Sequence, residues 1–375
     1  MTATQQRPAT TGTRKKDDYL YGLDLLRVVG SCAVVVTHLI AWFAIYDQEF
    51  WLMTWVDEGV VGTLHVNPRM HFMGVAVFLV VSGVVVTHVA DRETPAQFLR
   101  RRVVRLVPLL WVATLLAWIL INLGFRVSGA DDPELGVGDL LRGLVLGNFF
   151  QIPQVGLVGV TWTLLVQIGF YAWVAATIPV LRRHPWIPPL AAAPLCFVVV
   201  LLTFGSDWPW ARTAGGLVAY LPLLCIGQLI SLVHSRKITP LVGTAIGAVH
   251  FLFVVWVDKL SWYASQGDSV PRTLLIALLL AVLLVAMKGP VSRSAFVRGW
   301  AKRTYAIYLV HVMAMYPVFG LLMPHLNRTL VVVIGVVWVA VLSEVLHRFI
   351  EMPADRAVRR WERRRRERRE AARAG

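Results

Sequence analysis

Charged residues are scarce in this chain, where Asp, Glu, Lys and Arg together make up 16% of the sequence. Soluble domains carry about 25% charged and about 45–50% apolar residues. Here the hydrophobic residues reach 57%, and the mean hydropathy is +0.63. The shortage of charge therefore excludes an ordinary soluble protein and indicates a polytopic membrane protein.

Cysteine is also rare, and its three residues, Cys32, Cys196 and Cys225, all lie in apolar segments. A disulfide framework or a zinc site needs more cysteines at regular spacing. We therefore expect these three to be small buried hydrophobic residues. His65 and His71 have a spacing that matches no metal-ligand pattern, so no metal is expected.

Long apolar runs, in contrast, are abundant. A transmembrane helix needs about 20 mostly apolar residues. The shorter apolar run at 140–153 contains Gly147 and Pro153, so we expect an interfacial or re-entrant piece there. The predicted fold is an all-α bundle of about ten transmembrane helices. The spans are predicted at 22–46, 70–90, 103–125, 157–181, 187–205, 214–234, 239–257, 271–288, 303–323 and 328–350.

Membrane topology explains most of the basic residues. The chain has 37 Lys and Arg against 22 Asp and Glu, for a net charge of +15. Clusters of Lys and Arg precede the first predicted span and follow every second span. Cytoplasmic connections carry the basic excess, so both termini are predicted to lie in the cytoplasm, in a multi-pass protein of the plasma membrane. Nucleic acid is not expected as a partner.

The two ends of the chain are polar, unlike the transmembrane domain predicted at 20–352. Residues 1–19 lack the pattern of a cleavable signal peptide, so we expect a disordered cytosolic tail. Residues 353–375 mix Arg with Glu, which predicts a basic, helical cytosolic tail that can contact anionic lipid. Whether two chains form a homodimer is left open.

Two polar residues of the first span are not explained by topology. Arg27 and His38 are eleven residues apart, which places them on one helix face, about 16 Å apart along the axis. The alternatives are a snorkelling anchor for Arg27 and a structural hydrogen bond for His38. The shared face favours a polar cavity, in which a histidine is suited to proton transfer.

Four arginines stand where the chain enters the third predicted span. Arg100, Arg101, Arg102 and Arg105 fall within six residues. A cytoplasmic flank explains some of them. Their density also suits a polyphosphate, because guanidinium groups bind phosphate in bidentate fashion.

Two further spans carry polar or aromatic residues at helical spacing. In the ninth span, Tyr305, Tyr308 and His311 follow one another at intervals of three residues and drift slowly around one face. Packing explains an aromatic stripe, but a histidine inside the membrane indicates function. In the second span, Ser82 and Gly83 form a small pair that is typical of close helix contact.

The start of the fourth predicted span combines aromatic and amide side chains. Trp162 lies where an interfacial aromatic anchor is expected. Gln167 and Tyr171 lie deeper and share a face, being four residues apart. The three are candidate substrate-binding residues.

In this order, these stretches resemble the acyltransferase-3 family of integral membrane acyltransferases. The resemblance covers roughly residues 20 to 356. It is carried by LDLLR with Arg27 and His38, FLVVSG from Phe78, RRVVRLVP from Arg101, TWTLLVQIGFY from Thr161, YAIYLVH from Tyr305 and FIEMPADR from Phe349.

The resemblance implies transfer of an acyl group, often acetyl, from a cytosolic acyl-CoA to a hydroxyl. Implied acceptors are carbohydrates of surface polysaccharides, glycolipids, or secondary metabolites such as macrolides. His38 is implied as the catalytic residue, with Arg27 as its motif partner and the arginine cluster, especially Arg102 and Arg105, on the acyl-CoA side. Arg27, Tyr308 or His311 would then stabilise the oxyanion. Direct transfer and a covalent acyl-histidine are both open.

The chain departs from the family pattern at one place. Many members have one or two Glu where this chain has Gln167 and Ile168. Glutamine forms hydrogen bonds but cannot accept a proton. Asp24 is three residues from Arg27 and is expected to pair with it rather than with His38. The competing hypotheses are a membrane transporter, whose pathways also carry intramembrane Arg and His, and a catalytically inactive family member.

Overall fold

The computed structural model describes residues 21–127, 134–151, 154–208, 210–260 and 269–374, in which every regular element is a helix. The predicted N-terminal tail at 1–19 lies outside these residues. The three cysteines are free, with Cys196 and Cys225 buried and Cys32 half-buried. The all-α fold and the burial of Cys196 and Cys225 agree with the sequence predictions, whereas Cys32 is less buried than expected.

Each of the ten predicted spans is occupied by a helix. Eight helices among the described residues are long and apolar enough to cross a membrane, and two apolar helices are shorter, at 17 residues each. Seventeen residues rise about 25 Å, close to the hydrocarbon thickness of a bilayer. The eight are α1 (Tyr21–Ile45), α3 (His71–Ala90), α4 (Pro95–Asn122), α6 (Trp162–Arg183), α8 (Ala211–His234), α9 (Pro240–Lys259), α11 (Ala295–Leu322) and α12 (Arg328–Leu346), and the two are α7 (Ile187–Thr203) and α10 (Val270–Ala286).

The remaining elements are short or lie at the chain's end. Between α1 and α3 lie α2 (Trp51–Thr54), a π-helix (Trp55–Gly62) and a 3-10 turn (Pro68–Met70). Residues 152–153 of the run at 140–153 lie outside the described residues, and the rest contributes to α5 (Val137–Leu144) and a 3-10 turn (Gly147–Phe149), both too short to span. Its interfacial or re-entrant placement stays a prediction. A further 3-10 turn (Gly159–Thr161) leads into α6, and a π-helix (His347–Glu351) joins α12 to α13 (Met352–Ala374).

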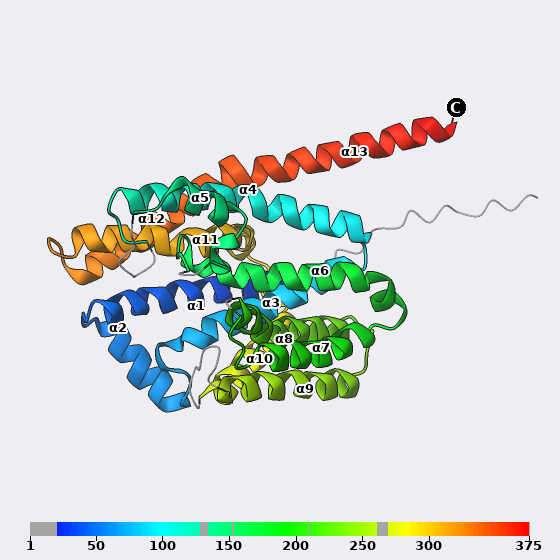
Figure 1. Ribbon diagram of the computed structural model, residues 1–375, viewed down its shortest axis with the longest axis horizontal. Coiled ribbons are helices and arrows are strands. Elements are labelled where there is room, and N and C mark those ends of the chain that lie inside the picture. Colours follow the sequence, from blue (N-terminus) through cyan, green and yellow to red (C-terminus); the bar gives the residue numbers. More distant parts are fainter. Residues whose placement is uncertain (1–20, 128–133, 152–153, 209, 261–268, 375) are drawn as a thin grey trace, which may run out of the picture.

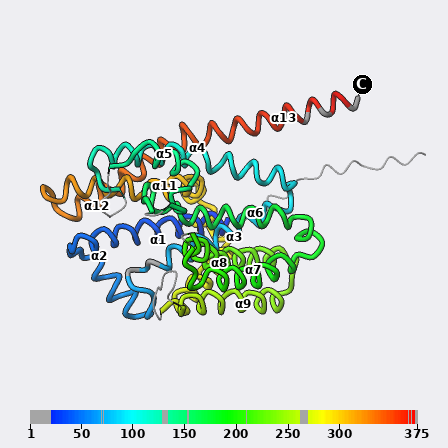
Figure 2. The backbone as a smooth tube through the Cα atoms, in the orientation of Figure 1, coloured from blue at the N-terminus to red at the C-terminus, as the bar shows by residue number. Residues whose placement is uncertain are grey.

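The helix α1 occupies the interior of the bundle (Figure 1). It packs against α3, α10 and α11, and most of its length is buried by these neighbours. The tube view shows α7, α8 and α9 gathered on one side of α1, with α4, α11 and α12 on the other (Figure 2). A polar residue on α1 therefore faces protein rather than lipid.

Small residues allow a very close contact between α3 and α8. A Cβ atom added at Gly83 would lie 2.1 Å from the Leu224 carbonyl oxygen, and one added at Gly227 would lie 2.1 Å from the Val80 carbonyl oxygen. Only glycine leaves room for two backbones at that distance. The prediction that Ser82 and Gly83 permit close helix contact is confirmed.

Candidate active site

Two histidines meet where α1 packs against α11. The His38 and His311 rings lie edge to face with centroids 4.7 Å apart. His38 Nδ1 and His311 Nε2 are 3.1 Å apart, within hydrogen-bonding distance. His311 is fully buried, whereas His38 is half-buried and lines a cavity. The sequence named both residues without pairing them, since they are 273 positions apart.

The hydrogen bonds around this pair assign both protons. His311 Nδ1 lies 2.7 Å from the Tyr308 carbonyl oxygen, and His38 Nδ1 lies 3.0 Å from the Val34 carbonyl oxygen. Carbonyl oxygens only accept, so Nδ1 carries the proton in each neutral ring. The single His38 Nδ1–H is then shared between the Val34 carbonyl oxygen and His311 Nε2, and in this tautomer the lone pair of His38 is on Nε2. A general base requires this tautomer, in which Nε2 can accept a proton while Nδ1–H is hydrogen-bonded to His311.

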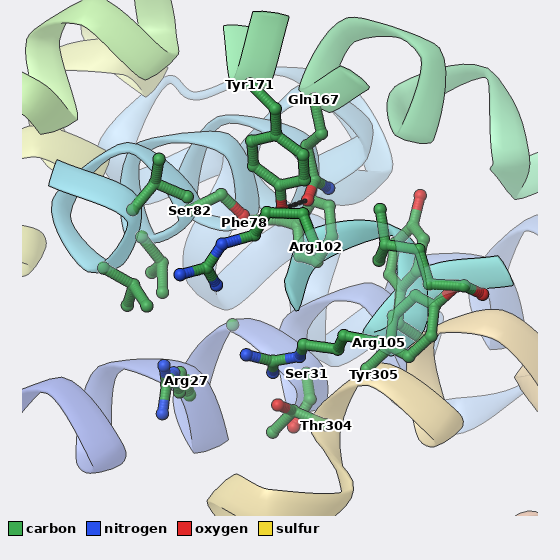
Figure 3. Close-up of a pocket in the computed structure, with 16 residues that line it drawn as sticks. Arg27, Ser31, Phe78, Ser82, Arg102, Arg105, Gln167, Tyr171, Thr304 and Tyr305 are labelled. Atoms are coloured by element: carbon green, nitrogen blue, oxygen red, sulfur yellow. Dashed lines mark hydrogen bonds between the residues drawn. The ribbon is translucent and has the colours of Figure 1, made fainter. Parts of the chain in front are cut away.

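A first cavity, which we call the arginine chamber, is lined by Arg27, Arg102 and Arg105. Figure 3 shows their three guanidinium groups directed toward one central space. The chamber encloses about 670 Å³ of empty space, including the part open to solvent. Asp24 lies 3.4 Å from Arg27, as predicted, and Glu93 lies 3.8 Å from Arg102. Two carboxylates against three guanidinium groups leave the chamber positive, which suits an anionic ligand.

Gln167 and Tyr171 also line the arginine chamber, opposite Arg27 (Figure 3). The Tyr171 hydroxyl donates to Gln167 Oε1 at 3.0 Å, and both side chains are buried. The Gln167 amide thus accepts a hydrogen bond in the chamber without carrying charge.

A second cavity, the histidine chamber, is lined by His38, Thr37, Thr163, Trp162 and Tyr220, among others. The rings of Trp162 and Tyr220 are 4.8 Å apart and form an aromatic surface there. The three substrate-binding candidates are therefore divided: Trp162 faces the histidine chamber, while Gln167 and Tyr171 face the arginine chamber.

Tyr308 and Phe78 line both chambers. Their rings stack with centroids 4.1 Å apart and planes 8° apart. The Tyr308 hydroxyl donates to the Val160 carbonyl at 2.6 Å and also contacts the Thr163 hydroxyl. No local sequence pattern predicts this contact, because it joins a side chain of α3 to one of α11 far along the chain.

The remaining arginines of the cluster turn away from the chamber toward α13. Arg101 lies 2.7 Å from a Glu362 oxygen and 2.6 Å from Glu93, and Arg100 also pairs with Glu362. The Trp361 ring lies 4.6 Å from the Arg100 guanidinium. Hydrogen bonds from Arg101 and Arg100 lower the pKa of Glu362 to about 2, so its ion pairs form fully above pH ~4.5 and are lost only in strong acid.

The fold and the site define a polytopic membrane protein with a divided internal cavity, basic on one side and histidine-lined on the other. Among the described residues, no three His, Cys, Asp or Glu side chains are grouped to hold a metal ion. The model of the acyltransferase-3 family, described as an acyltransferase domain, matches residues 20–348. The chain belongs to this family of membrane acyltransferases, as its motifs predicted.

A curated relative supports the same assignment. Nodulation protein 10 of Rhizobium leguminosarum bv. viciae is 26% identical over 360 residues, covering 88% of this chain and 92% of that protein. No solved structure matches the chain. The similarity to the relative extends over most of the length of both chains.

Proposed function

We propose that this protein is an O-acyltransferase that moves an acyl group, with acetyl preferred, from acyl-CoA to a hydroxyl. The acceptor is a carbohydrate, a glycolipid or a small secondary metabolite such as a macrolide. The observation that carries the proposal is the adjacency of the two chambers: three guanidinium groups line one and His38 lines the other. The donor phosphates bind Arg102 and Arg105, while Arg100 and Arg101 lie on the α13 side of the same cluster.

The reaction follows from the assigned tautomers. His38 Nε2 takes the proton of the acceptor hydroxyl as its oxygen attacks the thioester carbon. The tetrahedral intermediate collapses, the carbon–sulfur bond breaks, and the departing CoA sulfur receives that proton from His38. His311 accepts the hydrogen bond from His38 Nδ1–H and so orients the base, while Arg27 lies in the arginine chamber and contributes its charge to binding of the donor there. The Tyr308 hydroxyl already donates to Val160, so we assign it a positioning role.

The proposal is tested with purified protein in liposomes, incubated with radiolabelled acetyl-CoA and a panel of sugars, glycolipids and macrolides. We expect labelled ester product and stoichiometric release of CoA. Binding of acetyl-CoA is measured separately by calorimetry. Absence of binding at millimolar concentration would favour the transporter hypothesis, and binding without transfer to any acceptor would favour an inactive family member.

Replacing Arg102 by alanine is expected to raise the KM for acyl-CoA about 10- to 100-fold, because a charge-assisted hydrogen bond contributes about 1.5–3 kcal/mol. The kcat should change less, since the phosphates are remote from the reacting carbon. Initial rates at varied acetyl-CoA measure both constants. Arg142 on α5 is the control, because it is exposed and pairs with Asp139 and Gln151. An unchanged KM for acyl-CoA in Arg102→Ala would contradict binding of the donor phosphates in the arginine chamber.

Replacing His311 by leucine is expected to lower kcat about 10- to 100-fold, because the base loses the neighbour that orients it. His311→Gln should retain more activity, since its amide oxygen can still accept from His38 Nδ1–H. The KM for acetyl-CoA should stay unchanged in both variants. Equal activity of the leucine and glutamine variants, each folded, would contradict an orienting hydrogen bond.

A further inference from the structure

The wall between the two chambers is aromatic. The residues that line both cavities are Phe78 and Tyr308, whose rings stack 4.1 Å apart. We call this pair the aromatic partition. On one side of it are the guanidinium groups, and on the other is His38.

The two halves of the partition are held differently. Tyr308 is buried, and its hydroxyl is fixed by the Val160 carbonyl at 2.6 Å and by Thr163. Phe78 is half-buried on α3 and has no polar atom to anchor it. The Phe78 ring therefore rests on van der Waals contact alone, and its removal would open the wall without breaking a hydrogen bond.

The proposed function requires the donor to cross this partition. If the CoA phosphates bind Arg102 and Arg105, the thioester carbon must pass the ring edges to reach His38. The acyl chain beyond that carbon then shares the histidine chamber with the acceptor hydroxyl. A longer acyl chain would have to occupy the space that the Phe78 ring already fills.

We propose that Phe78 determines acyl-group specificity, because its ring lines the histidine chamber and limits the length of the acyl chain that fits there. The wild-type protein then accepts acetyl and propionyl groups and rejects butyryl and hexanoyl groups. This inference rests on the proposed function, because it concerns the acyl donor of the same site.

The experiment measures kcat/KM for acetyl-, butyryl- and hexanoyl-CoA in wild type, Phe78→Ala and Phe78→Leu. We expect the hexanoyl-to-acetyl ratio to rise at least tenfold in Phe78→Ala and by a smaller factor in Phe78→Leu. Phe170→Ala is the control, because Phe170 on α6 is buried but lines neither chamber. Its ratio should stay at the wild-type value.

The outcomes separate this inference from the function on which it rests. A wild type that transfers no acyl group defeats the proposed function itself. If the wild type transfers acetyl, two results overturn only the specificity assignment. One is a hexanoyl-to-acetyl ratio that is unchanged in Phe78→Ala, and the other is a ratio that rises equally in Phe170→Ala. A folded Phe78→Ala protein that loses all transfer also overturns the specificity assignment, because opening the aromatic partition should not prevent acetyl transfer. If Phe78→Ala does not fold, the hexanoyl-to-acetyl ratio of Phe78→Leu tests the specificity assignment: a rise supports it and an unchanged ratio overturns it.

Discussion

Replacing His38 by alanine is expected to abolish acyl transfer, lowering kcat by about 10³-fold or more. A positioned general base contributes about 10²- to 10⁴-fold, and the nearest other imidazole, that of His311, is fully buried and does not line the histidine chamber. The rate is measured with radiolabelled acetyl-CoA and a responsive acceptor, normalised to folded protein. His38→Gln should be equally inactive, since glutamine keeps the polarity but cannot accept a proton.

A matched control for this experiment is available within the bundle. His250 on α9 is also fully buried, and its Nε2 lies 2.8 Å from the Pro189 carbonyl oxygen. It lines neither chamber, so His250→Gln should retain activity per folded molecule. Acyl transfer at the wild-type rate by folded His38→Ala would contradict the assignment of His38 as the general base. Label that remains on the wild-type protein without acceptor, and is absent from His38→Ala, would instead support a covalent acyl-histidine.

The length of the apolar runs was sufficient to predict the helices of the bundle. Whether a run of about 20 apolar residues can form a span depends on the run itself, so even α7 and α10, with 17 residues each, were found from sequence. The shared face of Arg27 and His38 was predictable for the same reason, because it follows from helix geometry alone.

The composition of the site depends on contacts between helices, which no local pattern contains. The pairing of His38 with His311 requires α1 to pack against α11. The turn of Arg100 and Arg101 toward Glu362 requires α13 to lie along α4. Both contacts join residues more than 250 positions apart in the chain.

The separation of Trp162 from Gln167 and Tyr171 into different chambers can be predicted from their spacing in the sequence. Trp162 and Gln167 are five residues apart, which rotates them by about 140° around a helix. Gln167 and Tyr171 are four apart and share a face. The different chambers of Trp162 and of the other two agree with these angles.

Replacing Gly83 by valine is expected to remove nearly all folded protein. An added Cβ would lie 2.1 Å from the Leu224 carbonyl oxygen, which belongs to the backbone and cannot rotate away. Overpacking of a well-packed core costs about 1–3 kcal/mol and occasionally more, and here two helices must separate. The yield of monodisperse protein after detergent extraction, and its thermal midpoint, measure the effect. Gly83→Ala should show a smaller loss of the same kind.

The control is Gly169→Ala on α6, where an added Cβ meets nothing within 4 Å. That variant should fold normally and gain up to about 1 kcal/mol, because alanine is the better helix former. The same crossing positions the site, since α3 carries Phe78 as well as Gly83. Any Gly83→Ala protein that does fold should therefore show a changed acyl-length preference along with a lower thermal midpoint. A Gly83→Val protein with wild-type yield and midpoint would contradict the close contact of α3 with α8.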